Sequence, residues 1–150
     1  MQAPDHPRST AALFGHPLHP MLVPFPIVCF VGALLTDIAY AQTTFIMWSN
    51  FSAWLITAGL ATGALAGLLG LADYVGSRSV RRRRAAPWHM GINIVVMLLE
   101  LINILVHSRD GWTSVVPEGL ALSAISVALL LVSGWLGQHL VYRHGVGVAR

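Results

Sequence analysis

Charged residues are scarce in this chain of 150 residues: they make up 10% of it, against 55% hydrophobic residues. Soluble domains carry about a quarter charged residues, so the composition excludes an ordinary soluble domain. The scarcity is greatest between Ile38 and Ala72, where no Asp, Glu, Lys or Arg occurs. About 20 uncharged apolar residues cross a hydrocarbon core, and a longer run of this kind therefore predicts an integral membrane protein.

Lysine is absent and cysteine occurs once, so arginine supplies every positive charge and no internal disulfide can form. The sequence pI of about 9.8 could suggest nucleic acid as a partner. Four of the arginines, however, form the run Arg81–Arg84 between two apolar segments. A membrane-topology signal explains such a run better than a DNA-binding face does. We therefore expect a lipid bilayer, and no nucleic acid, around this chain.

Four apolar segments predict an all-α, four-helix transmembrane bundle in a single domain. Only helices and closed barrels satisfy their backbone polar groups inside lipid, and the segments lack the strict alternation of barrel strands. Prolines stand at or just before the start of three segments, where the first helical N–H groups have no intrahelical partner. The expected spans are residues 21–41, 48–74, 88–107 and 118–142, with residues 1–20 as a polar N-terminal segment.

The arginines predict the orientation of the bundle. Arg78 and Arg81–Arg84 lie between the second and third spans, and the positive-inside rule places that connector in the cytoplasm. Both termini are then expected to be cytoplasmic, and Arg109 is the only basic residue on the other side. Three further arginines fall on the cytoplasmic side under this assignment: Arg8, Arg143 and Arg150.

The third span carries a stripe of polar residues. At about 100° per residue, the stripe lies within an arc of roughly 80°, which predicts that it faces the bundle interior and not lipid. Its members are His89, Asn93, Glu100, Asn103 and His107. We interpret the two asparagines as links between helices.

A carboxylate in mid-membrane costs several kcal/mol unless it is neutral or paired. Glu100 lies roughly 16 Å along its helix from His89, and Asp37 of the first span is expected at a similar or somewhat greater depth. We expect these two acids to share a proton or to be hydrogen-bonded through Asn103. Asp37, Asn93, Glu100, Asn103 and His107 then form an intramembrane polar seam, whose alternative role is packing alone.

The predicted topology gathers five of the seven histidines at the cytoplasmic boundary and leaves His107 alone at the outer one. Imidazole binds zinc, copper, iron and nickel. In Gly15-His16-Pro17-Leu18-His19-Pro20, two prolines restrict the backbone around two imidazoles. The candidate cofactor ligands are His16, His19, His89 and His144, with Asp73 as a further candidate for a metal ion. The alternative is that these side chains only cap helix ends and fix loops.

Three stretches resemble a family of bacterial membrane proteins catalogued as domain of unknown function 2231. They are the segment from Gly15 to Pro26, Trp88-His89, and the segment from Gly134 to Val148. The resemblance implies a four-helix inner-membrane protein with His16, His19, His89 and His144 as its typical histidines. Gln138-His139 depart from it, because relatives more often have glycine and an acidic residue there.

Some relatives resemble fusions to iron–sulfur domains, which favours electron transfer by analogy. The leading hypothesis is therefore a redox or metal-binding membrane subunit that holds haem b or a transition-metal ion, with a redox protein or a second copy as partner. The alternatives are proton or small-solute transport along the third-span stripe, or a non-catalytic assembly subunit. The sequence has no phosphate loop, nucleotide fingerprint or convincing Ser-His-Asp set, so enzymatic activity is not implied.

Overall fold

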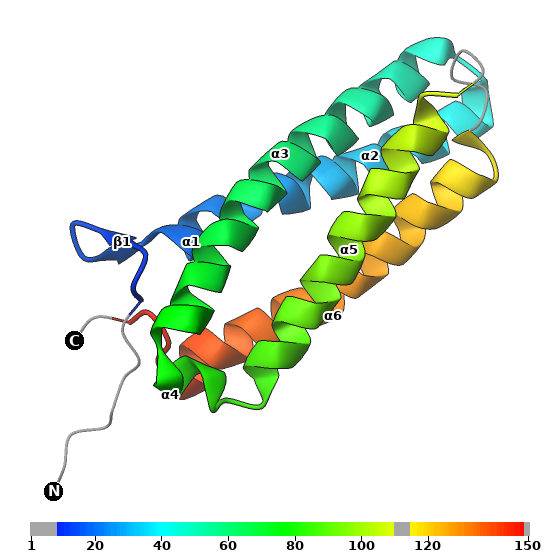
Figure 1. The fold of residues 1–150 in the computed structure, drawn as a ribbon. Coiled ribbons are helices and arrows are strands. Elements are labelled where there is room, and N and C mark those ends of the chain that lie inside the picture. Colours follow the sequence, from blue (N-terminus) through cyan, green and yellow to red (C-terminus); the bar gives the residue numbers. More distant parts are fainter. Residues whose placement is uncertain (1–8, 110–114, 149–150) are drawn as a thin grey trace, which may run out of the picture.

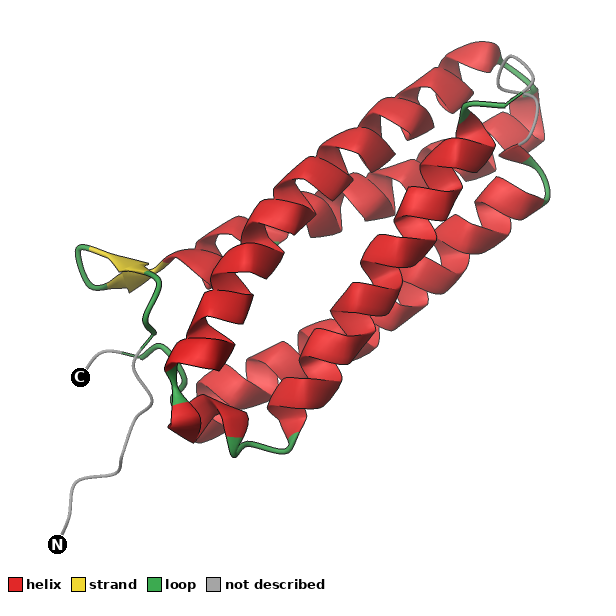
Figure 2. Cartoon of the chain, viewed as in Figure 1, coloured by secondary structure: helices red, strands yellow, loops and turns green. Residues whose placement is uncertain are grey.

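A computed structural model describes residues 9–109 and 115–148 of the chain, which are almost entirely helical (Figure 2). Four long helices form an elongated bundle (Figure 1). They are α2 (Pro24–Thr43), α3 (Ile46–Gly76), α5 (Ala85–His107) and α6 (Glu118–His144). The short elements are β1 (Ala12–Leu13), its antiparallel partner β2 (His16–Pro17), α1 (Leu18–Leu22) and α4 (Arg78–Arg81).

All four long helices are long and apolar enough to cross a membrane. They extend the spans expected from the sequence by three residues or fewer at any end. The first span begins at Leu18, because α1 runs almost directly into α2. Between them, Pro24 has no N–H to donate to the preceding turn, so the helix is interrupted at Val23. Of the expected N-terminal segment, residues 1–8 lie outside the described residues.

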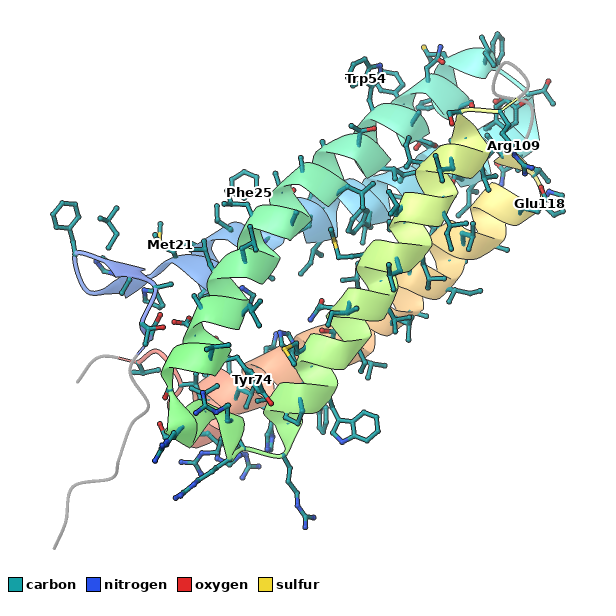
Figure 3. All side chains as sticks on the ribbon, viewed as in Figure 1. Met21, Phe25, Trp54, Tyr74, Arg109 and Glu118 are labelled. Carbon is teal, nitrogen blue, oxygen red and sulfur yellow. The ribbon has the colours of Figure 1, made fainter. Side chains whose placement is uncertain are left out.

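The bundle is apolar outside and polar inside. Trp54 and Leu131 are 75% and 73% exposed, whereas Asp37, Glu100 and His107 are completely buried. Figure 3 shows Trp54 pointing away from the helices. This distribution is the one expected when the surrounding solvent is lipid and ionisable groups face the protein interior.

The bundle consists of two helical hairpins, α2–α3 and α5–α6, whose burial patterns repeat. In α2 the buried positions are Pro26, Phe30, Ala33 and Asp37. Seventy residues later, α5 buries Val96, Glu100, Asn103 and His107. In α3, the buried set includes Ser52, Ile56, Gly59 and Ala66. Sixty-seven residues later, α6 buries Gly119, Ser123, Ser126 and Ser133.

The two hairpins are therefore copies of one structural unit. Both first helices, α2 and α5, run away from the same end of the bundle (Figure 1). The copies are thus parallel, related by an approximate two-fold axis along the bundle, as in repeats whose axis lies along the membrane normal. Our sequence analysis did not detect this repeat. Two short matches could have revealed it: Pro-x-His at residues 17–19 and 87–89, and Gly-x-Leu-Gly at residues 67–70 and 134–137.

Candidate functional site

The repeat brings one histidine from each half together. His19 lies in α1 and His89 near the start of α5, and their ring centroids are 6.2 Å apart with the planes at 84°. His19 Nδ1 lies 2.7 Å from the Ala66 carbonyl oxygen of α3. His89 Nδ1 lies 2.9 Å from the Ser133 carbonyl oxygen of α6. The two histidines therefore make equivalent contacts with equivalent helices.

The carbonyl contacts favour one tautomer for both rings. A carbonyl oxygen only accepts hydrogen bonds, so these contacts favour a hydrogen on Nδ1 in His19 and in His89, although His89 Nδ1 also lies 3.0 Å from the Ser133 hydroxyl oxygen. In the neutral imidazole, Nε2 is then the nitrogen with the free lone pair. Asn93 Nδ2 approaches His89 Nε2 at 3.3 Å. The two amide hydrogens of Asn93, however, have closer acceptors in the His89 carbonyl at 2.8 Å and Ser133 Oγ at 2.7 Å. The Nε2 lone pair of His89 therefore stays available.

A glycine makes room for each ring. A Cβ on Gly70 would stand 2.9 Å from His19 Nδ1, and one on Gly137 would stand 3.1 Å from His89 Cε1. Each glycine lies one helical turn after the residue whose carbonyl accepts the hydrogen bond. The first glycines of the two motifs, Gly67 and Gly134, have open space around them. The last glycine of each Gly-x-Leu-Gly motif is therefore the one that the ring contact requires.

The 6.2 Å between the ring centroids of this histidine pair, His19 and His89, fits an ordinary edge-to-face ring contact, and it also fits two imidazoles on one metal ion. Imidazole nitrogens bind metals at about 2.0–2.1 Å, which places the ring centroids of two opposed imidazoles roughly 6 Å apart. Among the described residues, no group of three or more His, Cys, Asp or Glu side chains could hold a metal ion. A tetrahedral site built from protein ligands alone needs three or four. The pair therefore suits a group that brings its remaining ligands with it.

The other expected ligands lie elsewhere. His16 is exposed in the β1–β2 hairpin. His144 packs edge-on against His139, with centroids 5.1 Å apart, and its Nδ1 lies 3.5 Å from Nη1 of Arg83. His139 in turn stacks on Trp135. An arginine beside His144 disfavours a bound cation there, because like charges repel.

Asp73 anchors the N-terminal segment. Its carboxylate accepts hydrogen bonds from the Ser9 hydroxyl, from the Thr10 backbone N–H and hydroxyl, and from the Ala11 backbone N–H, at 2.7–3.0 Å. The structure places Asp73 apart from the histidine pair and commits its oxygens to these donors. Its position at the end of α3 is the one predicted, but its contacts are those of a structural anchor.

A second group of polar residues, the membrane-buried cluster, lies toward the other end of the bundle. Asp37 Oδ1 is 2.9 Å from His107 Nε2, and Asp37 Oδ2 accepts a hydrogen bond of 2.6 Å from the Ser123 hydroxyl. Asn103 Nδ2 donates to Ser123 Oγ at 2.9 Å and to Glu100 Oε2 at 3.2 Å. All five side chains are completely buried. The cluster consists of Asp37, Glu100, Asn103, His107 and Ser123.

The cluster differs from the sequence-based expectation in two ways. His107 is not alone at the outer boundary: it is buried against Asp37, because the repeat sets these two positions at the same height on either side of the axis. The expected link between Asp37 and Glu100 runs through Ser123 as well as Asn103. Ser123 was not among the expected members of the seam, since the periodicity of one helix does not show what faces it.

The third-span stripe is not one continuous polar path. Asn93 bonds to Ser133 beside the histidine pair, and Glu100 belongs to the membrane-buried cluster. Between them, the inward position of α5 is the buried Val96. The described side chains therefore form two separate polar groups along α5.

Residues 15–150 match the family described as “Predicted membrane protein (DUF2231)”. The chain belongs to this family. With its four apolar helices, it is a multi-pass membrane protein. Comparisons with curated proteins and with solved structures found no match.

Proposed function

We propose that this protein is a redox subunit that holds one haem b between His19 and His89, with a transition-metal ion as the alternative occupant. The observation that carries the proposal is the state of the two rings. In the tautomer that donates Nδ1–H to the backbone carbonyl, each ring has its lone pair on Nε2, where His89 has a contact of 3.3 Å with Asn93 Nδ2. A hydrogen bond from the second ring nitrogen to a carbonyl is what orients histidines that bind metals and raises their basicity.

Haem is favoured over a bare ion because the pair offers only two protein ligands in the described part of the chain. The porphyrin supplies four nitrogen ligands of its own, and histidine is an axial ligand of haem iron. When bound, the group would supply one-electron chemistry. The residues of this chain would set the orientation of the iron ligands and exclude water from them, through Ala66 and Ser133 on the facing helices.

The arginines support an orientation with this site near the cytoplasmic side of a bacterial inner membrane. Arg81, Arg82 and Arg84 are exposed at the same end of the bundle as α1 and the start of α5 (Figure 1). The positive-inside rule puts such a connector in the cytoplasm. A redox partner protein would then approach from there, and electrons would pass between it and the histidine pair.

The decisive experiment is the visible spectrum and the metal content of the same protein sample, purified in mild detergent without chelator. We expect a Soret band, or a stoichiometric transition metal, that is lost in His19→Ala and in His89→Ala. His16→Ala and His139→Ala serve as matched controls and should retain it. A folded protein that remains colourless and metal-free after expression with added haem precursor and metal salts contradicts the proposal, and leaves the assembly-subunit alternative.

Transport along the third-span stripe receives less support. A proton relay needs polar groups in hydrogen-bonding reach from one side to the other. The buried Val96 stands between the two polar groups of α5. Proton flux into proteoliposomes that depends on both His89 and Glu100 would nevertheless favour transport over the redox role.

A further inference from the structure

We propose that Glu100 is a proton-binding site inside the membrane: at neutral pH its carboxyl group carries a proton, and Oε1–H donates toward Ser126. This site is distinct from the histidine pair. Glu100 lies eleven residues beyond His89 on α5, or roughly 16 Å along the helix. The proposal does not rest on haem or metal binding.

The first argument is the charge balance of the bundle interior. Away from its cytoplasmic-side end, α3 carries no charged residue, because residues 38–72 contain none. α2 contributes Asp37, and α5 contributes Glu100 and His107. At the far end, Arg109 and Glu118 are both exposed and pair with one another at 3.7 Å. In the described part of the bundle interior, two buried acids therefore share one buried base, and at least one acid must carry a proton for the cluster to be neutral.

The hydrogen bonds decide which acid is ionised. Asn103 donates to Ser123 Oγ, so the Ser123 hydroxyl hydrogen points to Asp37 Oδ2, at 2.6 Å. An O–H···O bond of about 2.5–2.7 Å is typical of an ionised acceptor. The His107 ring donates Nδ1–H to the Asn103 carbonyl at 3.0 Å and faces Asp37 with Nε2 at 2.9 Å. Asp37 thus has short contacts with the Ser123 hydroxyl and with the His107 imidazolium, and both favour its ionised form.

Glu100 has much weaker support for a negative charge. Oε2 accepts a hydrogen bond from Asn103 at 3.2 Å, which is longer than a charge-assisted bond of about 2.7–2.9 Å, and Oε1 has no partner within hydrogen-bond criteria among the described residues. An uncompensated carboxylate in a buried site costs several kcal/mol. Protonation removes that cost, so the proton belongs on Glu100.

Unpartnered oxygens mark where this proton points. Ser126 of α6 lies beside the Glu100 carboxyl. Neither Glu100 Oε1 nor Ser126 Oγ has a hydrogen-bond partner among the described residues, although both are buried. Oε1 is the carboxyl oxygen that receives no hydrogen bond from Asn103, so the proposed proton is placed there, where the Ser126 oxygen can accept it. The repeat supports this contact, because the equivalent positions, Phe30 and Gly59, also touch.

Infrared spectroscopy tests the proposal directly. A protonated carboxylic acid has a C=O stretch that a carboxylate lacks, and the stretch shifts in D₂O. At neutral pH we expect this band in the intact protein and its loss in Glu100→Gln. Glu118→Gln is the matched control, since Glu118 is 64% exposed and should not contribute.

Isotope labelling keeps the test valid if a variant does not fold. The chain has only two glutamates, Glu100 and Glu118. Growth with glutamate labelled with ¹³C at the side-chain carboxyl should shift the band of the wild-type protein to lower frequency. A folded wild-type protein without the band, or with a band that the label leaves in place, overturns the proposal.

Discussion

Asp37 and His107 occupy equivalent positions of the two repeats, and a contact of 2.9 Å between Oδ1 and Nε2 joins them inside the bundle. Both side chains are completely buried. Together with the hydrogen bond from Ser123 to Asp37, this contact links the two hairpins at the end of the bundle opposite the histidine pair. The association of the two halves is therefore expected to be sensitive to a change at Asp37.

We predict that Asp37→Leu destabilises the protein by about 3–5 kcal/mol, because removing one partner of a buried pair leaves the other charge uncompensated. His107→Leu should cost a similar amount. The double variant should be more stable than either single variant, since apolar residues can replace a buried ion pair at little cost. Unfolding in mixed detergent micelles measures all three.

Thr36→Val is a suitable control for that series. It removes the neutral hydrogen bond of 2.7 Å between Thr36 and Ser52 at nearly the same height. Neutral hydrogen bonds between membrane helices contribute about 0.6 kcal/mol on average. If Asp37→Leu cost no more than Thr36→Val, the pair would be no stronger than an ordinary interhelical bond.

The two Gly-x-Leu-Gly motifs offer a paired prediction. Gly70→Ala and Gly137→Ala place a methyl group 2.9 Å from His19 Nδ1 and 3.1 Å from His89 Cε1, so the rings must move away from their carbonyl partners. We expect both variants to lose any cofactor bound by the histidine pair. The measurement is the visible spectrum and metal content described above.

Gly67→Ala and Gly134→Ala are the controls, because nothing lies within 4 Å of a Cβ there. Alanine in a helix interior is favoured over glycine by about 1 kcal/mol, so these two variants should be as stable as the parent or more so. Cofactor loss in all four variants alike would show that the ring contact is not the cause.

A variant of Asp73 tests whether its carboxylate anchors the N-terminal segment or binds a metal ion. The backbone N–H groups of Thr10 and Ala11 donate hydrogen bonds to the Asp73 carboxylate at 2.7 and 2.8 Å. We therefore expect Asp73→Ala to speed amide hydrogen exchange at these two residues. Metal content and spectrum should not change. Loss of a bound metal in this variant, with Thr10 and Ala11 still protected, would restore Asp73 as a ligand.

The repeat predicts that the protein can be expressed as two separate hairpins that still assemble. A chain cut between α4 and α5, near Arg84, separates two complete hairpins. We expect the two pieces, co-expressed, to purify as one complex, because buried contacts such as Asp37–His107 join them. Asp37→Leu in the first piece should weaken the complex. Two pieces that fail to associate, although each is inserted in the membrane, would contradict this view of the fold.

The long helices could be predicted because apolar length and proline placement are local properties. The inward face of α5 was likewise readable, since Glu100, Asn103 and His107 recur at helical spacing and all three are buried. Their partners, Asp37 and Ser123, could not be predicted, because those contacts depend on the relative height and rotation of separate helices. The separate positions of His16 and His19 could not be predicted for the same reason. Their spacing suggested joint binding, but the hairpin at Phe14 and Gly15, both with positive φ, leaves His16 exposed.

The parallel arrangement of the two hairpins has a consequence for the origin of the protein. A hairpin of two spans returns the chain to the side from which it started, so a tandem gene duplication inserts the second copy in the same orientation without new topogenic signals. A symmetric homodimer of one such hairpin would place one histidine from each copy beside its axis. In the single chain the two halves differ in sequence: position 30 is a phenylalanine, whereas its counterpart is Glu100. An acid on one side only is a state that a symmetric dimer cannot reach.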